Sequence, residues 1–97
     1  MAKYRLSNTA KEDLIRIHQY GTQKFGTRQA DLYFEAFFTA FDRIAERPFS
    51  FEAVDFIKEG YRRCVSGADT IYFRVVDESA KIITIIGKQD LEKLRNG

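Results

Sequence analysis

Apolar residues recur at helical spacing near the start of the chain. They form one stripe at Ala10, Leu14, Ile17 and Gly21. The charged residues between them fall on the other faces, which predicts an amphipathic helix packed against a core. Ser7 is of a type that caps helix N-termini, and Gly26 is of a type that ends helices in a left-handed conformation. A capping box beginning at Thr9 is the alternative start, two residues later.

A second helix is predicted after Gly26, with Thr27 as its cap. Its apolar positions keep a three-four spacing over four turns, at Ala30, Tyr33, Phe34, Phe37, Phe38, Phe41, Ile44 and Ala45. Pro48 ends this helix because it lacks the N–H group that a helix interior needs. We therefore expect an antiparallel helical hairpin, and we interpret its aromatic stripe as core rather than as a ligand pocket.

The second half of the chain alternates β-rich segments with turns. The segments 61–65, 70–76 and 81–86 are rich in β-branched and aromatic residues, and 66–69 and 77–80 are turns of hairpin length. They predict a three-stranded antiparallel meander, preceded by a short strand at Tyr4-Arg5-Leu6. The expected fold is one α+β domain spanning residues 1–97, with the order β-α-α-β-β-β and an antiparallel sheet packed against the helical hairpin.

Alternation along the middle strand separates two faces. Ile71, Phe73 and Val75 are expected to meet the helices, whereas Tyr72 and Arg74 are expected to face outward. The last strand is apolar on both faces, so its second face needs a cover.

The charge is nearly balanced, with sixteen basic and fourteen acidic side chains and a net charge of +2. That balance alone does not indicate a nucleic-acid-binding protein. Basic residues do gather between Lys58 and Lys88, however. From this segment we predict one surface that binds an acidic or phosphate-bearing partner, formed by Arg62, Arg63, Tyr72, Arg74 and Lys88.

Several classes of function are disfavoured. The N-terminus develops no uncharged apolar run, so we expect neither a signal peptide nor a membrane helix, and we expect a cytoplasmic protein. The single cysteine, Cys64, has no neighbouring metal-ligand pattern and is read as a buried apolar residue, so no metal or cofactor is expected.

Catalytic groups are also scarce. Metal-free RNA cleavage needs a base, a cation and an acid close to the reacting atoms. Arginines and lysines supply cations, but the one histidine, His18, falls mid-helix beside the core stripe. Tyrosine has an ordinary pKa of about 10, which makes it a poor proton acceptor at neutral pH. We therefore predict no catalytic residue.

Taken in order, short strings along the chain resemble the ParE/RelE family of toxins from bacterial type II toxin–antitoxin modules, and most closely its ParE branch. The strings are Tyr4-Arg5-Leu6-Ser7, Phe25-Gly26, Ile44-Ala45-Glu46-Arg47-Pro48, Gly60-Tyr61-Arg62-Arg63, Ser66-Gly67, Ile71-Tyr72-Phe73-Arg74-Val75 and Asp90-Leu91. The resemblance implies a four-stranded antiparallel sheet with a packed helical hairpin. It also implies inhibition of DNA gyrase, neutralisation by a ParD-like antitoxin, and contact with DNA only through the antitoxin complex.

Two departures bear on the ribosome-dependent RNase branch of this family. The chain has Ile86-Gly87-Lys88 where many relatives carry a histidine, and its last eight residues contain no tyrosine. A gyrase inhibitor that uses the basic strand face and the 88–95 tail is the leading hypothesis. A RelE-like mRNA endonuclease and a non-toxic partner of an antitoxin are the alternatives.

Overall fold

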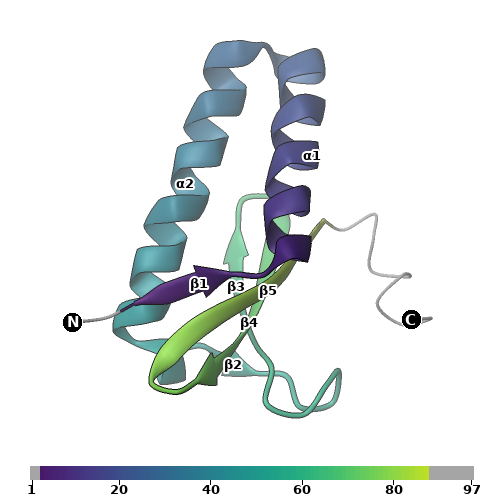
Figure 1. Cartoon of the computed structure of the whole chain (residues 1–97). Coiled ribbons are helices and arrows are strands. Elements are labelled where there is room, and N and C mark those ends of the chain that lie inside the picture. The colour runs from purple at the N-terminus through teal and green to yellow at the C-terminus, as the bar shows by residue number, and fades with distance from the viewer. Residues whose placement is uncertain (1–2, 88–97) are drawn as a thin grey trace.

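The computed structural model describes residues 3–87 of the chain (Figure 1), so Lys88 and the tail after it lie outside the described residues. The elements in chain order are β1 (Tyr4–Leu6), α1 (Asn8–Phe25), α2 (Thr27–Glu46), the 3₁₀ turn η1 (Pro48–Ser50), β2 (Glu52–Ala53), β3 (Arg62–Ser66), β4 (Asp69–Val76) and β5 (Ser79–Gly87). The predicted α+β fold, with the helical hairpin, the three-stranded meander and the Pro48 boundary, is confirmed.

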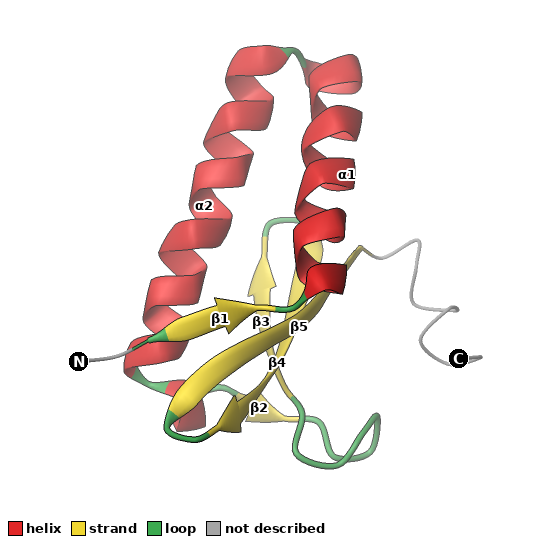
Figure 2. Ribbon diagram, viewed as in Figure 1, coloured by secondary structure: helices red, strands yellow, loops and turns green. Residues whose placement is uncertain are grey.

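The sheet has five strands in the order β1-β5-β4-β3-β2. Two of its features differ from the expectation of a wholly antiparallel sheet. β1 pairs with β5 in parallel, and the two-residue β2 extends the other edge by pairing with β3. A strand of two or three residues has too little periodicity to reveal its partner, so neither pairing could be predicted. Figure 2 shows the two helices rising together from one side of this sheet.

The helix ends follow their sequence signals in part. The backbone N–H of Ala10 donates to Ser7 Oγ at 3.0 Å, which confirms Ser7 as the cap of α1. Gly26 joins the helices with φ 90° and ψ 161°, a conformation available to glycine but not the left-handed one that we expected. The same glycine is the N-cap of α2, so the prediction that Thr27 caps this helix was wrong. A one-residue connection leaves Thr27 already inside the helix.

The core lies between the helical hairpin and the sheet. Phe37, Phe41 and Ile44 are fully buried, while Phe34 and Phe38 are half-buried and pack against the same cluster. The stripe from Phe37 to Ile44 is therefore core, as predicted. Cys64 is also buried, and burial raises the pKa of its thiol, which leaves it protonated and unreactive at neutral pH.

Strand β4 separates the faces as predicted, with one exception. Ile71 and Phe73 belong to the main core and Arg74 is exposed, but Tyr72 is only 1% exposed although it lies outside that core cluster. The prediction that Tyr72 faces solvent was wrong. Val54, in the connector before β3, is likewise fully buried outside the main cluster. The connector therefore has a buried apolar residue of its own, which its sequence did not indicate.

Helix α1 also completes the hydrogen bonding of β5. Where β1 ends, Ser7 Oγ donates to the Ile83 carbonyl at 2.6 Å. Six residues later, the Asp13 carboxylate accepts the Ile85 N–H at 3.0 Å and the Thr84 hydroxyl at 2.6 Å. These contacts join the start of α1 to the sheet and fix the inclination of the hairpin.

Candidate partner-binding surfaces

The predicted basic residues do not form a single surface. Arg62 and Cys64 alternate with Arg63 along β3, and Cys64 lies in the main core, so Arg62 is on the helix-facing side of the sheet. Its guanidinium donates to the Phe51 carbonyl at 2.7 Å and stacks over the Phe49 ring, 5.0 Å from the centroid. Arg62 therefore holds the connector against the domain, and its position contradicts the prediction of one shared basic face.

Arg63 lies on the opposite face and is paired. Its guanidinium contacts the Glu52 carboxylate at 2.7 Å across the β2–β3 ladder. This hydrogen bond, with a smaller contribution from Tyr72, raises the pKa of Arg63, so the side chain is a permanent cation. The partner, Glu52, lies on β2, a two-residue strand that was not predicted from the sequence.

Arg74 is exposed on this outward face, and two further cations lie beside it. Arg74 is in register with Lys81 on β5, and Lys81 is in register with Arg5 on β1. Neither Lys81 nor Arg5 was predicted from the sequence as a site residue. In the sequence, each of these cations is flanked by apolar residues, which indicates that it faces away from the core. That the three cations lie side by side follows only from the parallel pairing of β1 with β5.

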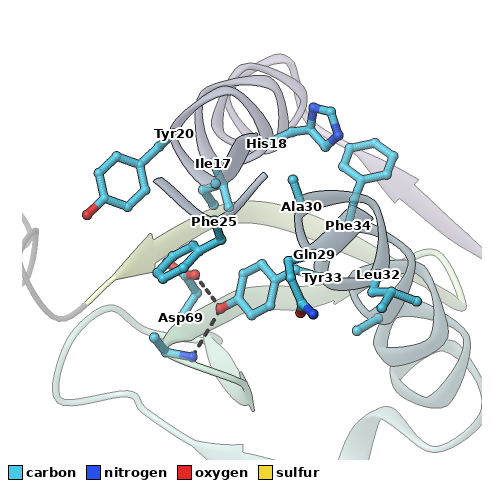
Figure 3. Close-up of a pocket in the computed structure, with 13 residues that line it drawn as sticks. Ile17, His18, Tyr20, Phe25, Gln29, Ala30, Leu32, Tyr33, Phe34 and Asp69 are labelled. Carbon is cyan, nitrogen blue, oxygen red and sulfur yellow. Dashed lines mark hydrogen bonds between the residues drawn. The ribbon is translucent and has the colours of Figure 1, made fainter. Parts of the chain in front are cut away.

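A second surface lies at the far end of the hairpin. A groove of about 630 Å³ opens between α1, α2 and the β3–β4 turn, and we call it the tip groove (Figure 3). Its lining is mostly apolar. Tyr20, Phe25 and Leu32 border it with exposures of 49%, 63% and 54%, which is unusually large for apolar side chains on neighbouring turns of two helices.

A hydrogen-bonded tyrosine closes one side of the tip groove (Figure 3). The Tyr33 hydroxyl donates to Asp69 Oδ2 at 2.6 Å and accepts the Ala68 N–H at 3.0 Å. Burial, together with the Asp69 carboxylate, raises the pKa of Tyr33 to about 12. Gly67 is required beneath the ring, because its φ is +61° and an added Cβ would lie 2.4 Å from Tyr33 Cε1. The helix and the turn are thereby locked together.

The single histidine bridges the two helices at the rim of this groove. His18 Nε2 lies 2.8 Å from Asp31 Oδ1, and the imidazole ring meets the edge of Phe34 at a centroid distance of 5.3 Å. This exposed polar contact and the ring contact help to orient α1 against α2. His18 is thus far from the cationic row on the outward face of the sheet.

Residues 3–87 contain no cluster of three histidine, cysteine, aspartate or glutamate side chains arranged to hold a metal ion. Within the same range, neither helix is long and apolar enough to cross a membrane. The described surfaces offer cations and apolar area, which are suited to binding macromolecules.

The sequence of this chain matches a known protein family. Residues 4–95 match the family model described as the ParE toxin of the type II toxin–antitoxin system parDE. Toxin ParE1 of Caulobacter vibrioides is 39% identical over 75 residues, which cover 77% of this chain and 78% of that protein. Toxin ParE1 of Mycobacterium tuberculosis is 30% identical over 95 residues, which cover 98% of this chain and 97% of that protein.

Solved structures share the fold. A structure of the chromosomal ParDE toxin–antitoxin system from P. aeruginosa aligns with a TM-score of 0.79 at 16% identity, covering 90% of this chain and 96% of that one. The RelBE2 toxin–antitoxin complex from Mycobacterium tuberculosis aligns with a TM-score of 0.58 at 20% identity, covering 90% and 98%. The match to the family model and the two ParE1 relatives, over most of the chain, show that this protein belongs to the ParE family of type II toxins within the ParE/RelE superfamily.

Proposed function

We propose that this ParE-family toxin is a non-catalytic inhibitor of DNA gyrase in the cytoplasm and is neutralised by a ParD-like antitoxin. The observation that carries the proposal is the chemistry of the outward sheet face. Arg63, Arg74 and Lys81 supply positive charge there, while His18 lies on the helical hairpin and pairs with Asp31. A surface of this kind can bind an acidic or phosphate-bearing target without performing proton transfer.

The target contact comprises Arg63 and Arg74 around the buried Tyr72. Arg63 and Tyr72 are cross-strand partners, and Arg74 follows Tyr72 after one residue on the same face. Arg62 contributes indirectly, because it holds Phe49 and the connector. Lys88 remains a predicted contact outside the described residues.

The antitoxin contact is the tip groove. An amphipathic helix places apolar side chains on one face at a spacing of three to four residues, and a groove bordered by exposed Tyr20, Phe25 and Leu32 fits such a face. Two structurally similar proteins are described as a ParDE system and as a toxin–antitoxin complex. These descriptions support a protein partner for this chain as well.

A RelE-like, ribosome-dependent mRNA endonuclease is the second candidate. The fold similarity to a chain of the RelBE2 toxin–antitoxin complex favours it at the level of fold. Such an activity would be favoured by Arg62, Tyr72, Arg74 and Lys88 lying close together, because metal-free RNA cleavage needs its cation and its proton-transfer groups at one place. Arg62 lies on the helix-facing side of the sheet and Tyr72 is buried, which argues against that convergence.

The test is gyrase supercoiling of relaxed plasmid in the presence of the purified toxin. We expect loss of supercoiled product and appearance of linear DNA after protease treatment, both reversed by the cognate antitoxin. A parallel reaction with ribosomes and mRNA tests the second candidate. Unimpaired supercoiling at large molar excess, together with mRNA cleavage, would replace the gyrase proposal with the endonuclease.

A further inference from the structure

Three exposed cations form a straight row across the outward face of the sheet. Arg5 on β1 is the register partner of Lys81 on β5, which is in turn the register partner of Arg74 on β4. From this row we infer that the toxin itself binds duplex DNA by its phosphate backbone, with Arg5, Lys81 and Arg74 as the contacts.

The three side chains point the same way because of their neighbours. Tyr4 and Leu6 pack against the core on either side of Arg5, and Ala80 and Ile82 do so on either side of Lys81. Strand alternation therefore directs both cations away from the helices. Arg74 follows the buried Phe73 and lies on the same face, and all three residues are exposed.

The row carries uncompensated charge. Within residues 3–87, no ion pair or hydrogen bond joins the side chains of Arg5, Lys81 or Arg74 to a carboxylate, in contrast to the neighbouring Arg63, which pairs with Glu52. Like charges on adjacent strands repel one another. A row of this kind is expected where a polyanion supplies the missing negative charge.

The spacing of the row suits a phosphate backbone. Neighbouring strands lie about 4.8 Å apart, so the three Cα positions span about 10 Å. One strand of duplex DNA presents a phosphate for each 3.4 Å or so along its axis, which places about three phosphates opposite the row. Three flexible side chains can therefore neutralise consecutive phosphates on one strand.

The same surface is poorly suited to single-stranded nucleic acid, which proteins bind by stacking bases on exposed aromatic rings. The aromatic residue just before β3, Tyr61, is half-buried, and the Lys58 ammonium lies 5.6 Å from its ring centroid. The choice of DNA over RNA duplex rests on the proposed function, since gyrase acts on duplex DNA. The row would place the toxin on the DNA that the enzyme holds.

The experiment measures fluorescence anisotropy of a labelled 20-base-pair DNA duplex titrated with antitoxin-free toxin, without gyrase. Three phosphate contacts predict that affinity falls about 40-fold between 50 and 200 mM salt, a log–log slope of about −2.7. The variant Arg5→Gln/Arg74→Gln/Lys81→Gln is expected to bind about 10-fold or more weakly at 50 mM salt and to lose most of that slope.

The matched control is Lys11→Gln/Arg28→Gln/Arg47→Gln. It removes the same charge at exposed positions on α1, at the start of α2 and just after α2. Circular dichroism confirms that both variants are folded. Equal loss of DNA binding in the two variants, absence of duplex binding by the unmodified toxin at 50 mM salt, or stronger binding to polyglutamate or to an RNA duplex each overturns the inference.

The gyrase assay separates this inference from the proposed function. If the toxin binds duplex through the row but leaves supercoiling untouched, the inference stands and the gyrase proposal fails. If the toxin poisons gyrase but has no affinity for duplex, the gyrase proposal stands and the inference fails.

Discussion

The base and the tip of the helical hairpin expose very different amounts of apolar surface. At the base, Phe41 and Ile44 of α2 have no exposed surface, and the Phe41 ring packs against Tyr4 of β1 at a centroid distance of 5.3 Å. At the tip, Phe25 and Leu32 expose 63% and 54% of their surface around a groove. One continuous pair of helices therefore provides core at one end and a candidate docking site at the other.

The contrast has a geometric origin. The tip of the hairpin extends beyond the sheet (Figure 2), so the apolar stripe has no strands to cover it there. At this end, hydrogen bonds rather than buried apolar contacts hold the helices to each other and to the β3–β4 turn. Tyr33 bonds to Asp69 and to the β3–β4 turn, and His18 bridges to Asp31. Stability is thus expected to be concentrated at the base, and recognition at the tip.

The largest expected effect comes from truncation at the base. Phe41→Ala removes a fully buried ring and leaves a cavity, which costs about 3–5 kcal/mol of unfolding free energy. Urea denaturation measures this change. Phe56→Ala deletes the same ring where it is 77% exposed and is expected to change stability by about 0.5 kcal/mol or less. Similar losses for the two variants would refute the assignment of Phe41 to the core.

An intermediate effect is expected at the junction of tip and sheet. Tyr33→Phe removes a hydroxyl that donates to Asp69 at 2.6 Å and accepts from Ala68 at 3.0 Å, so we expect a loss of about 1–3 kcal/mol. Tyr20→Phe is the control, because the Tyr20 hydroxyl contacts only the exposed Lys24 ammonium among the described residues. An equally large loss of unfolding free energy in the control would show that the Tyr33 hydrogen bonds do not stabilise this junction more than an exposed tyrosine contact does.

The same tyrosine gives a pH signature. Its pKa is raised to about 12 in the folded state, so between pH 10 and 12 the folded chain keeps a proton that the unfolded chain releases. The stabilisation of the folded state by the protonated Tyr33 hydroxyl is present in full below pH 10 and is lost as the pH rises through 12. Denaturation curves for the unmodified toxin should show this decline, and those for Tyr33→Phe should show a smaller one, because the pKa of Tyr4 is also raised, by burial and by Asp42.

The smallest effect on stability is expected at the open side of the groove. Phe25→Ser/Leu32→Ser changes exposed side chains, so unfolding free energy should move by about 0.5 kcal/mol per substitution or less. Antitoxin affinity, measured by calorimetry, should nevertheless fall by at least about 10-fold, because both residues line the proposed helix site. Phe56→Ser/Val65→Ser removes comparable exposed apolar groups elsewhere and should bind normally. Normal antitoxin binding by the groove variant would move the antitoxin site away from the tip.

The sequence predicted features that depend on local periodicity and turn chemistry. The stripe through Phe37 and Phe41, the Ser7 cap and the β3–β4–β5 meander all follow from neighbouring residues. What depends on long-range pairing was missed. The row of Arg5, Lys81 and Arg74 exists only because β1 lies parallel to β5, and a three-residue strand does not indicate this partner.

The tip groove was missed for a different reason. Ala30, Tyr33 and Phe34 in its lining continue the same helical spacing as the core, so the sequence cannot show where the sheet stops covering them. The turning of Arg62 toward Phe51 likewise depends on the connector before β3, which has no regular pattern. Side chains that are defined by irregular segments are the least predictable part of the site.

The Asp13 carboxylate has a consequence for solubility. It accepts a hydrogen bond from the Ile85 N–H just beyond the end of β1, where β5 would otherwise present an open edge. Unprotected strand edges invite pairing between molecules and lead to aggregation, and a negative charge at such an edge opposes it. Whenever this edge is not covered by a partner, the chain is thereby guarded, at this point, against pairing with copies of itself.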